Sequence, residues 1–273
     1  MEHEAVLRLG IFLGVLTGVT VWEFAAPRRG RALPRKERWL PNLSLVVLDT
    51  LLVRLLFPVT AVALAAMGQE RGWGGLNQVI WPEWMEILLA VVLLDFVIYL
   101  QHVLFHALPV LWRLHMVHHA DLDVDVTTGL RFHPLEMLLS MGIKLAAVHA
   151  SGASPLAVLI FEVLLNGMAL FNHGNIRLPE AVDRALRWMF VTPDMHRSHH
   201  SHLSPEANMN FGFNLSWWDR ILGTYWPRPA EGHEEMEIGL EHQREPEKCQ
   251  PLTAMLLMPV RSKLGEYTIN RRW

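Results

Sequence analysis

Long apolar stretches constrain this chain more than any other feature of its sequence. Residues 5–26, 43–67 and 84–108 are each dominated by aliphatic and aromatic side chains. An α-helix of about 20 apolar residues matches the ~30 Å hydrocarbon core of a bilayer. Since lipid offers no hydrogen bonds to the backbone, such stretches cross as helices. The sequence therefore predicts an all-α integral membrane helical bundle.

The composition agrees with this class and excludes others. Apolar residues make up 51% of the 273 residues and charged residues 19%, whereas soluble domains carry about 25% charged residues. The net charge of −3 provides no basic field, so we expect no nucleic-acid partner. The single Cys249 excludes an intramolecular disulfide and any zinc or iron–sulfur site that needs several thiolates from this chain.

The charges beside the apolar stretches predict the orientation. Residues 28–38 contain six Lys or Arg and one Glu, and short loops of this kind stay on the cytoplasmic side. Glu2 and Glu4 stand where a signal peptide would carry basic residues, so the first stretch is interpreted as a retained anchor. By alternation, the third stretch ends on the cytoplasmic side.

A further apolar pair, residues 134–151 and 155–171, is separated by Gly152. This pair either crosses the membrane or is re-entrant, and both arrangements return the chain to the cytoplasmic face at His173. We expect a multi-pass membrane protein with its active site on the cytoplasmic face, in a membrane that the sequence does not identify.

The histidines carry the functional argument, because eight of the 15 fall in three boxes of regular spacing. Residues three and four apart share one face of a helix, so an i, i+4 pair or a His-x-x-His-His box directs several imidazoles at one centre. The third box also has a helix start, with Thr192 as the N-cap and Pro193 at the first helical position. The boxes are His102 and His106; His115, His118 and His119; and His196, His199 and His200; with His173 between the second and the third.

So many imidazoles predict two metals rather than one. A structural zinc needs only four ligands, whereas imidazole suits Zn, Cu, Fe and Ni alike. A membrane zinc hydrolase is one alternative, but the sequence has no His-Glu-x-x-His motif. A metal transport or sensing protein is another, although its ligands would be expected near the middle of the membrane.

Residues 95–225 resemble the fatty acid hydroxylase and sterol desaturase superfamily, the membrane histidine-box di-iron oxygenases. Several motifs stand in that family's order. They are DFVIYLQHVLFH (95–106), WRLHMVHH (112–119), RFHPLE (131–136), FNHGNI (171–176), TPDMHRSHH (192–200) and WDRILGTY (218–225). Val103 departs from the pattern, because many relatives carry Arg after the first box histidine.

The resemblance implies a helical membrane fold with a cytoplasmic, histidine-rich dimetal cap. It implies two Fe ions, O₂ as co-substrate and a separate electron donor of ferredoxin, cytochrome b5 or reductase type. The implied reaction is hydroxylation or desaturation of a C–H bond in a lipid: a sterol, fatty acyl, sphingoid, alkylglycerol or carotenoid. The implied metal ligands are His102, His106, His115, His118, His119, His173, His196, His199 and His200.

Three further residues are candidates for supporting those ligands. Asp95 lies two helical turns before His102 and is predicted either to orient a ligand imidazole or to pair with Arg54. His133 is a candidate to support a ligand or to cap the helix that begins at Pro134, and Asn175 is a third candidate. We expect three parts: anchor helices with the basic loop (1–82), a histidine-box catalytic domain (83–228) and a polar C-terminal tail (229–273).

Overall fold

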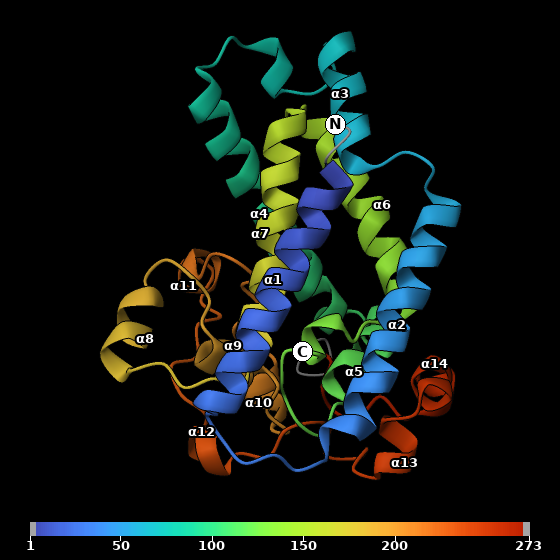
Figure 1. Cartoon of the computed structure of the whole chain (residues 1–273), viewed down its shortest axis with the longest axis vertical. Coiled ribbons are helices and arrows are strands. Elements are labelled where there is room, and N and C mark those ends of the chain that lie inside the picture. The colour runs from blue at the N-terminus through green and yellow to red at the C-terminus, as the bar shows by residue number, and fades with distance from the viewer. Residues whose placement is uncertain (1–3, 270–273) are drawn as a thin grey trace.

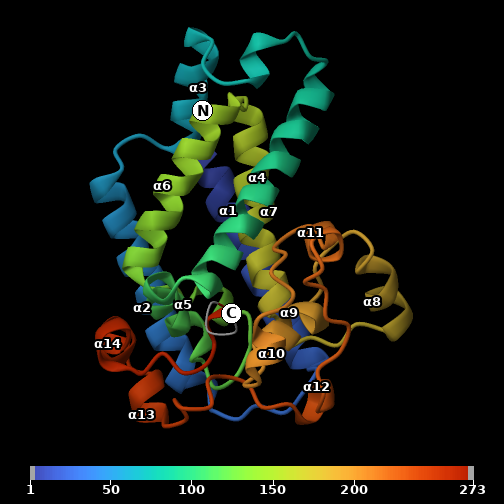
Figure 2. The ribbon, with the colours of Figure 1, turned by 180° about the vertical axis from the view of Figure 1, so that it is seen from behind.

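A computed structural model of the chain describes residues 4–269, and it is built of helices joined by loops (Figure 1). Within this range there are isolated β-bridges, such as Phe190 with Leu215, but no β-strand. The long helices form a bundle and the short helices gather at one end of it (Figures 1 and 2). The predicted all-α class is confirmed.

The bundle contains the helices that can cross a membrane. By length and composition there are four such units in the described range: α1, α2 with α3, α4 and α7. Many of their large apolar side chains are exposed, for example Leu55 at 76% and Leu88 at 54%, as contact with lipid requires. The chain is therefore a membrane protein. The bounds are α1 Glu4–Ala25, α2 Arg35–Leu56, α3 Ala61–Arg71, α4 Glu83–Ala107, α6 Pro134–Ser151 and α7 Pro155–His173.

The first and third predicted stretches coincide with α1 and α4, but the prediction of one continuous helix over 43–67 is wrong. Helix α2 ends at Leu56 and α3 begins at Ala61. Pro58 has no N–H for the helical ladder and disfavours helical backbone in the residue before it. Thr60 then starts α3, since its side chain accepts a hydrogen bond from the Ala63 N–H (3.1 Å).

Helices α6 and α7 form an antiparallel hairpin, and the turn between them lies at the end of the bundle away from α5 and α9 (Figure 2). Gly152 ends α6 with a φ of 71°, a left-handed conformation that favours glycine. Ser154 caps α7, and its N–H and hydroxyl both donate to Glu86 of α4. The hairpin returns the chain to His173, as expected. Whether α6 and α7 both span the membrane stays a prediction.

We call residues 108–133 and 174–269 the cap. Arg131 joins the two segments of the cap, because its guanidinium donates to the Cys249 carbonyl (2.6 Å) and to Gln250 Oε1 (3.0 Å). Helix α14 packs on α5 and α2 around the fully buried Trp112. The division at residues 82 and 228 stays a prediction. The short elements are η1 Leu76–Gln78, before α4, and in the cap α5 Pro109–His119, η2 Thr128–Leu130, α8 Glu180–Leu186, α9 Pro193–His199, α10 Ser204–Ala207, α11 Trp217–Ile221, α12 Gly232–Glu235, α13 Pro246–Cys249 and α14 Leu252–Arg261.

A buried ionic cluster fixes the start of α2 against the cap. The guanidinium of Arg38 is fully buried and donates to both carboxylate oxygens of Asp121 (2.8 Å each) and to Asp125 (2.6 Å). Buried charges are tolerated when they are paired in this way. The loop that follows the second histidine box is therefore held by the first turn of α2.

Candidate metal centre

Four helices bring the histidine boxes together where the bundle meets the cap. The last two turns of α4 carry His102 and His106, and the chain then turns at Leu108 and Pro109 so that α5 returns beside α4. Helix α7 contributes its last residue, His173, and α9 contributes the third box. Segments about 100 residues apart in the sequence thus meet in one place.

The start of α9 follows the sequence prediction. The Thr192 side chain accepts a hydrogen bond from the Met195 N–H (3.3 Å), and Pro193 is the first helical residue. His196 and His199 lie on this helix and His200 is its C-cap. The capped turn therefore fixes the direction in which all three imidazoles point.

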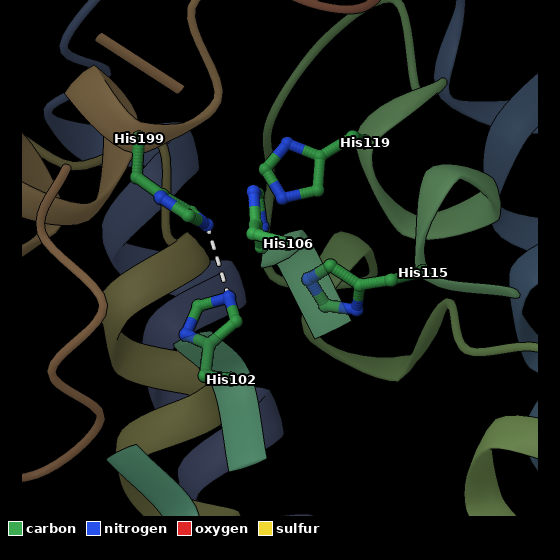
Figure 3. Close-up of side chains that lie close together, drawn as sticks. All are labelled: His102, His106, His115, His119 and His199. Atoms are coloured by element: carbon green, nitrogen blue, oxygen red, sulfur yellow. Dashed lines mark hydrogen bonds between the residues drawn. The ribbon is translucent and has the colours of Figure 1, made fainter. Parts of the chain in front are cut away.

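All nine predicted histidines lie in two adjacent groups, each able to hold a metal ion. Within each group, one ligand atom from every residue lies within 4.8 Å of all the others, and every member is buried. Figure 3 shows the members of the first group pointing toward one another from α4, α5 and α9. The first group is His102, His106, His115, His119 and His199, and the second is His118, His173, His196 and His200.

Oxygen acceptors outside the groups fix the rings through their Nδ1 atoms. Carbonyl oxygens face Nδ1 of His102 (Phe211, 2.9 Å), His118 (Arg131, 3.2 Å), His173 (Ala169, 2.6 Å) and His199 (Met209, 2.7 Å). Side-chain oxygens face Nδ1 of His106 (Asn208, 3.2 Å) and His115 (Glu136, 2.6 Å). A carbonyl only accepts, so the ring nitrogen facing it carries the proton.

The opposite nitrogens then face one another without a proton between them. A neutral imidazole has one N–H, and in His102 and His199 it is at Nδ1, yet their Nε2 atoms lie 3.0 Å apart. The Nε2 atoms of His118 and His173 repeat this arrangement at 3.1 Å. Two lone pairs at this distance repel each other unless a cation lies between them. Two nitrogens that bind one metal at about 2.1 Å, with the two bonds at right angles, are about 3.0 Å apart. The Nε2–Nε2 distances therefore match those of ligands that share a metal.

In the first group, Nε2 of His106, His115 and His119 is buried and has no hydrogen-bond partner. Burying such atoms unpaired is costly, so their presence in this group also fits bound metal.

The electrostatics of the cap keep its imidazoles neutral. Burial lowers the pKa of His115 to about 3. Burial, followed by the neighbouring imidazoles, also lowers the pKa of each of the other five histidines in the second and third boxes well below its ordinary value. Neutral imidazole is the form that binds metal, so these rings are ready for a cation at neutral pH.

The structure places the three supporting candidates away from the imidazoles. In the part of the chain that the structure describes, no hydrogen bond joins Asp95 to an imidazole or to Arg54, so neither of the contacts expected for it is present. It accepts hydrogen bonds from the N–H groups of Asn214 and Leu215 and from the Trp218 indole (2.8 Å). Asp95 thereby holds the segment that begins near Phe211, whose carbonyl faces His102, so it acts on the ring only at a distance.

His133 and Asn175 also have other partners. His133 caps α6, since its Nδ1 accepts from the Leu135 N–H (3.2 Å), and it lies outside both histidine groups. The capping interpretation therefore holds for His133. The Asn175 side chain exchanges hydrogen bonds with the backbone of Arg29 and joins the loop after α1 to the loop after α7. In the described range no hydrogen bond links Asn175 to an imidazole.

Sequence reasoning missed the side chains that do face the ligands, Glu136 and Asn208. Glu136 is 4% exposed, and a carboxylate near the start of an otherwise apolar helix was the one available signal for it. Asn208 follows the short α10, and its spacing from the boxes gave no indication of its role.

A cavity borders both groups from the bundle side. His102 and His115 of the first group and His118 and His196 of the second line it. Its remaining wall is mostly apolar. That wall consists of Ile98, Gln101 and Phe105 of α4, Phe132, Glu136 of α6, and Phe213. The two histidine groups therefore border one mostly apolar cavity.

Comparison with known proteins gives the context of this centre. The family model for fatty acid hydroxylase matches residues 87–224, which contain all nine histidines. No solved structure shows significant similarity to the chain.

Three curated relatives illustrate the range. An ornithine lipid hydroxylase, OlsE, of Rhizobium tropici is 33% identical over 153 residues, covering 55% of this chain and 45% of the relative. An alkylglycerol monooxygenase of Xenopus tropicalis is 26% identical, covering 59% and 33%. The cholesterol 25-hydroxylase of Homo sapiens is 29% identical, covering 51% and 50%. The chain thus spans between a third and a half of the length of these relatives.

Proposed function

This chain belongs to the fatty acid hydroxylase family, and from that premise we propose that it is a membrane-bound di-iron oxygenase that hydroxylates a lipid C–H bond with O₂. The observation that carries the proposal is the pairing of unprotonated Nε2 atoms across the histidine cluster, 3.0 Å apart in the first group and 3.1 Å in the second. Two cations resolve that repulsion, one in each group.

We propose five imidazoles for one iron and four for the other. The five are those of the first group and the four are those of the second. The chemistry that two bound irons supply is the reduction of O₂ and the cleavage of a C–H bond. Iron suits this role because imidazole-ligated iron with an open position binds O₂, and zinc, which has no redox chemistry, does not.

The chain's own residues position and shield the reaction. The acceptors at Nδ1, among them Glu136 and Asn208, keep six of the nine rings in the orientation and tautomer that leave Nε2 free. Ile98, Phe105, Phe132 and Phe213 give the cavity an apolar wall that holds a hydrocarbon segment and excludes water. The substrate carbon would lie in this cavity, in contact with both histidine groups.

The relatives support hydroxylation over desaturation and a lipid over a soluble substrate. All three are named as hydroxylases or monooxygenases, and they act on an ornithine lipid, an alkylglycerol and cholesterol. We propose a separate electron donor of ferredoxin, cytochrome b5 or reductase type, because the reaction consumes two electrons for each O₂.

We propose that the centre faces the cytoplasm. The basic segment 28–38 lies on the histidine side of the bundle, where Arg28 pairs with Asp194 of α9 and Arg38 with Asp121. Short basic segments remain on the cytoplasmic side of a membrane.

Substitution of His118 tests the function. His118→Ala removes one of four imidazoles from the second group, so we expect loss of iron and of O₂-dependent lipid oxidation together. His202→Ala is the matched control, because His202 directly follows the third box but lies outside both groups. The metal content would be measured on the purified proteins. The incorporation of ¹⁸O from ¹⁸O₂ into lipid would be measured in cells that produce each variant. Undiminished ¹⁸O incorporation in His118→Ala would refute the proposal.

A further inference from the structure

Six of the large apolar side chains exposed on the cap belong to two segments that are bonded to each other, outside every helix that can span the membrane. They come from the segment after α8 and from α11 with its C-cap. We call them the ledge. Trp188 and Ile221 are its most exposed members, at 68% and 69%. The ledge consists of Trp188, Met189, Phe190, Trp217, Ile221 and Leu222. An exposed apolar patch of this kind marks a binding surface rather than ordinary surface.

The two segments of the ledge form one rigid unit. The Trp217 indole donates to the Trp188 carbonyl (3.0 Å), and the Ser216 N–H donates to the Met189 carbonyl (3.1 Å). Phe190 and Leu215 form an antiparallel bridge. Because both backbones are fixed to each other, the six side chains belong to one continuous surface.

The ledge is attached to the middle of a membrane-spanning helix. Leu215 and Trp218, on either side of Trp217, donate to Asp95 of α4, and the Trp218 ring packs on Phe96 at 4.7 Å between centroids. In Figures 1 and 2, α11 is the part of the cap that reaches highest along the bundle.

The position of Asp95 sets the depth of the ledge. At 1.5 Å per residue, the 25-residue α4 is about 37 Å long and Asp95 lies about 18 Å from its start. A hydrocarbon core of about 30 Å that lies within the length of α4 includes this point wherever it begins, and its boundary on the histidine side is then about 12–19 Å from Asp95. The surface beside Asp95 is therefore at membrane depth.

The polar groups around the ledge suit the boundary between lipid and water. The Arg220 guanidinium lies over the rings of Trp188 (4.7 Å) and Tyr225 (4.0 Å). Arg187 forms an ion pair with Asp183 at the end of α8. Tryptophan beside arginine is typical of segments that lie in a membrane interface.

We propose that the ledge is inserted into the leaflet on the histidine side of the membrane, as a lipid-contact surface separate from the spanning helices. The occupant is bilayer lipid, because the ledge continues the lipid-exposed surface of α4 at the depth of Asp95. Phe190 lies two residues before the Thr192 cap of α9. The third histidine box is thus attached directly to a segment that is anchored in lipid.

Spin labels on the ledge test this without any enzymatic assay. Labels would be attached after Trp188→Cys or Ile221→Cys, with the full chain in phosphatidylcholine vesicles. Native Cys249 is buried, so the unsubstituted chain serves as the labelling control. Leu88→Cys on α4 is the lipid-exposed reference and Lys248→Cys on α13 the aqueous one. Collision with apolar O₂ and with a water-soluble Ni²⁺ chelate reports the depth of each label.

The readout is the ratio of the collision rate with O₂ to the collision rate with the chelate. For the ledge labels this ratio should be severalfold higher than for the label at 248 and close to that for the label at 88. A ratio equal to that at 248 would overturn the proposal. Shielding from both reagents with dipolar broadening would also overturn it, because a second copy of the chain would then cover the ledge. Leu222→Cys repeats the measurement at a third position if one labelled chain does not fold. None of these readouts depends on iron or turnover, so failure here leaves the proposed oxygenase function standing.

Discussion

The contact between Glu136 and His115 gives the sharpest test of how the chain holds its metals. Glu136 Oε1 lies 2.6 Å from His115 Nδ1, and both side chains are buried, at 4% exposure each. The carboxylate fixes the ring so that its unpartnered Nε2 points into the first histidine group. Glu136→Ala removes this acceptor and leaves a buried N–H unpaired.

Loss of such an acceptor typically lowers metal affinity about 10–100-fold, which corresponds to about 1.4–2.7 kcal/mol. We expect this loss in only one of the two metal equivalents, because Glu136 faces only the first group. Glu136→Gln keeps an acceptor oxygen at the same place and should retain most of the affinity. Leu139→Ala, exposed on the same helix, controls for truncation of a side chain in α6.

The assay is competition with a chelator of known affinity, followed by metal analysis of the retained protein. Glu136→Ala should release one equivalent at a chelator concentration at which the control keeps both. If Glu136→Ala retains both equivalents as tightly as the control does, the carboxylate has no part in orienting His115.

Three further outcomes follow from the same geometry. Asn208→Ala should weaken metal binding less than Glu136→Ala, because its 3.2 Å bond to His106 is uncharged; equal or greater metal release in the same chelator assay would contradict this. His133→Ala should leave both metals in place but lower the free energy of unfolding by about 1 kcal/mol, the usual cost of a lost N-cap. Denaturant unfolding measures this change, and loss of a metal would instead make His133 a ligand. The pKa of His115 falls from 6.5 in the unfolded chain to about 3 in the fold, so the unfolded state binds more protons between these values. As the pH falls from about 6.5 toward 3, the protonation of His115 should lower the free energy of unfolding of the metal-free protein by about 1.4 kcal/mol per pH unit. Unfolding curves whose midpoint does not change over that range would contradict a buried, neutral His115.

The sequence predicted the clustering of the histidines well because its information is local and periodic. Spacings of three and four residues place imidazoles on one helical face whatever the tertiary structure, so His115, His118 and His119 could be grouped from the sequence alone. The N-cap at Thr192 was readable for the same reason, since capping depends on neighbouring residues. Apolar length likewise predicted α1 and α4.

Long-range contacts were not readable in this way. Asp95 shares a face with His102 on α4, but its carboxylate bonds residues 214, 215 and 218, more than 100 positions away. The partition of the nine imidazoles into five and four crosses the boxes, since His118 and His119 belong to different groups. Such a partition depends on how α5 and α9 are rotated against each other. The spacing of histidines in the sequence does not predict that rotation.

The interruption between α2 and α3 was a local signal that apolar content concealed. Pro58 and Thr60 are a helix break and a helix start, but they lie inside a long, mostly apolar stretch. Length predicts that a stretch can cross the membrane, whereas backbone chemistry determines whether it does so as one helix.

The central claim is that imidazoles from α4, α5, α7 and α9 hold two irons. Metal analysis of the purified protein, combined with Mössbauer spectroscopy after growth on ⁵⁷Fe, measures this directly. We predict two irons per chain, in two unequal sites because one group has five imidazoles and the other four. Zinc in both sites, or a single metal per chain, would contradict the claim.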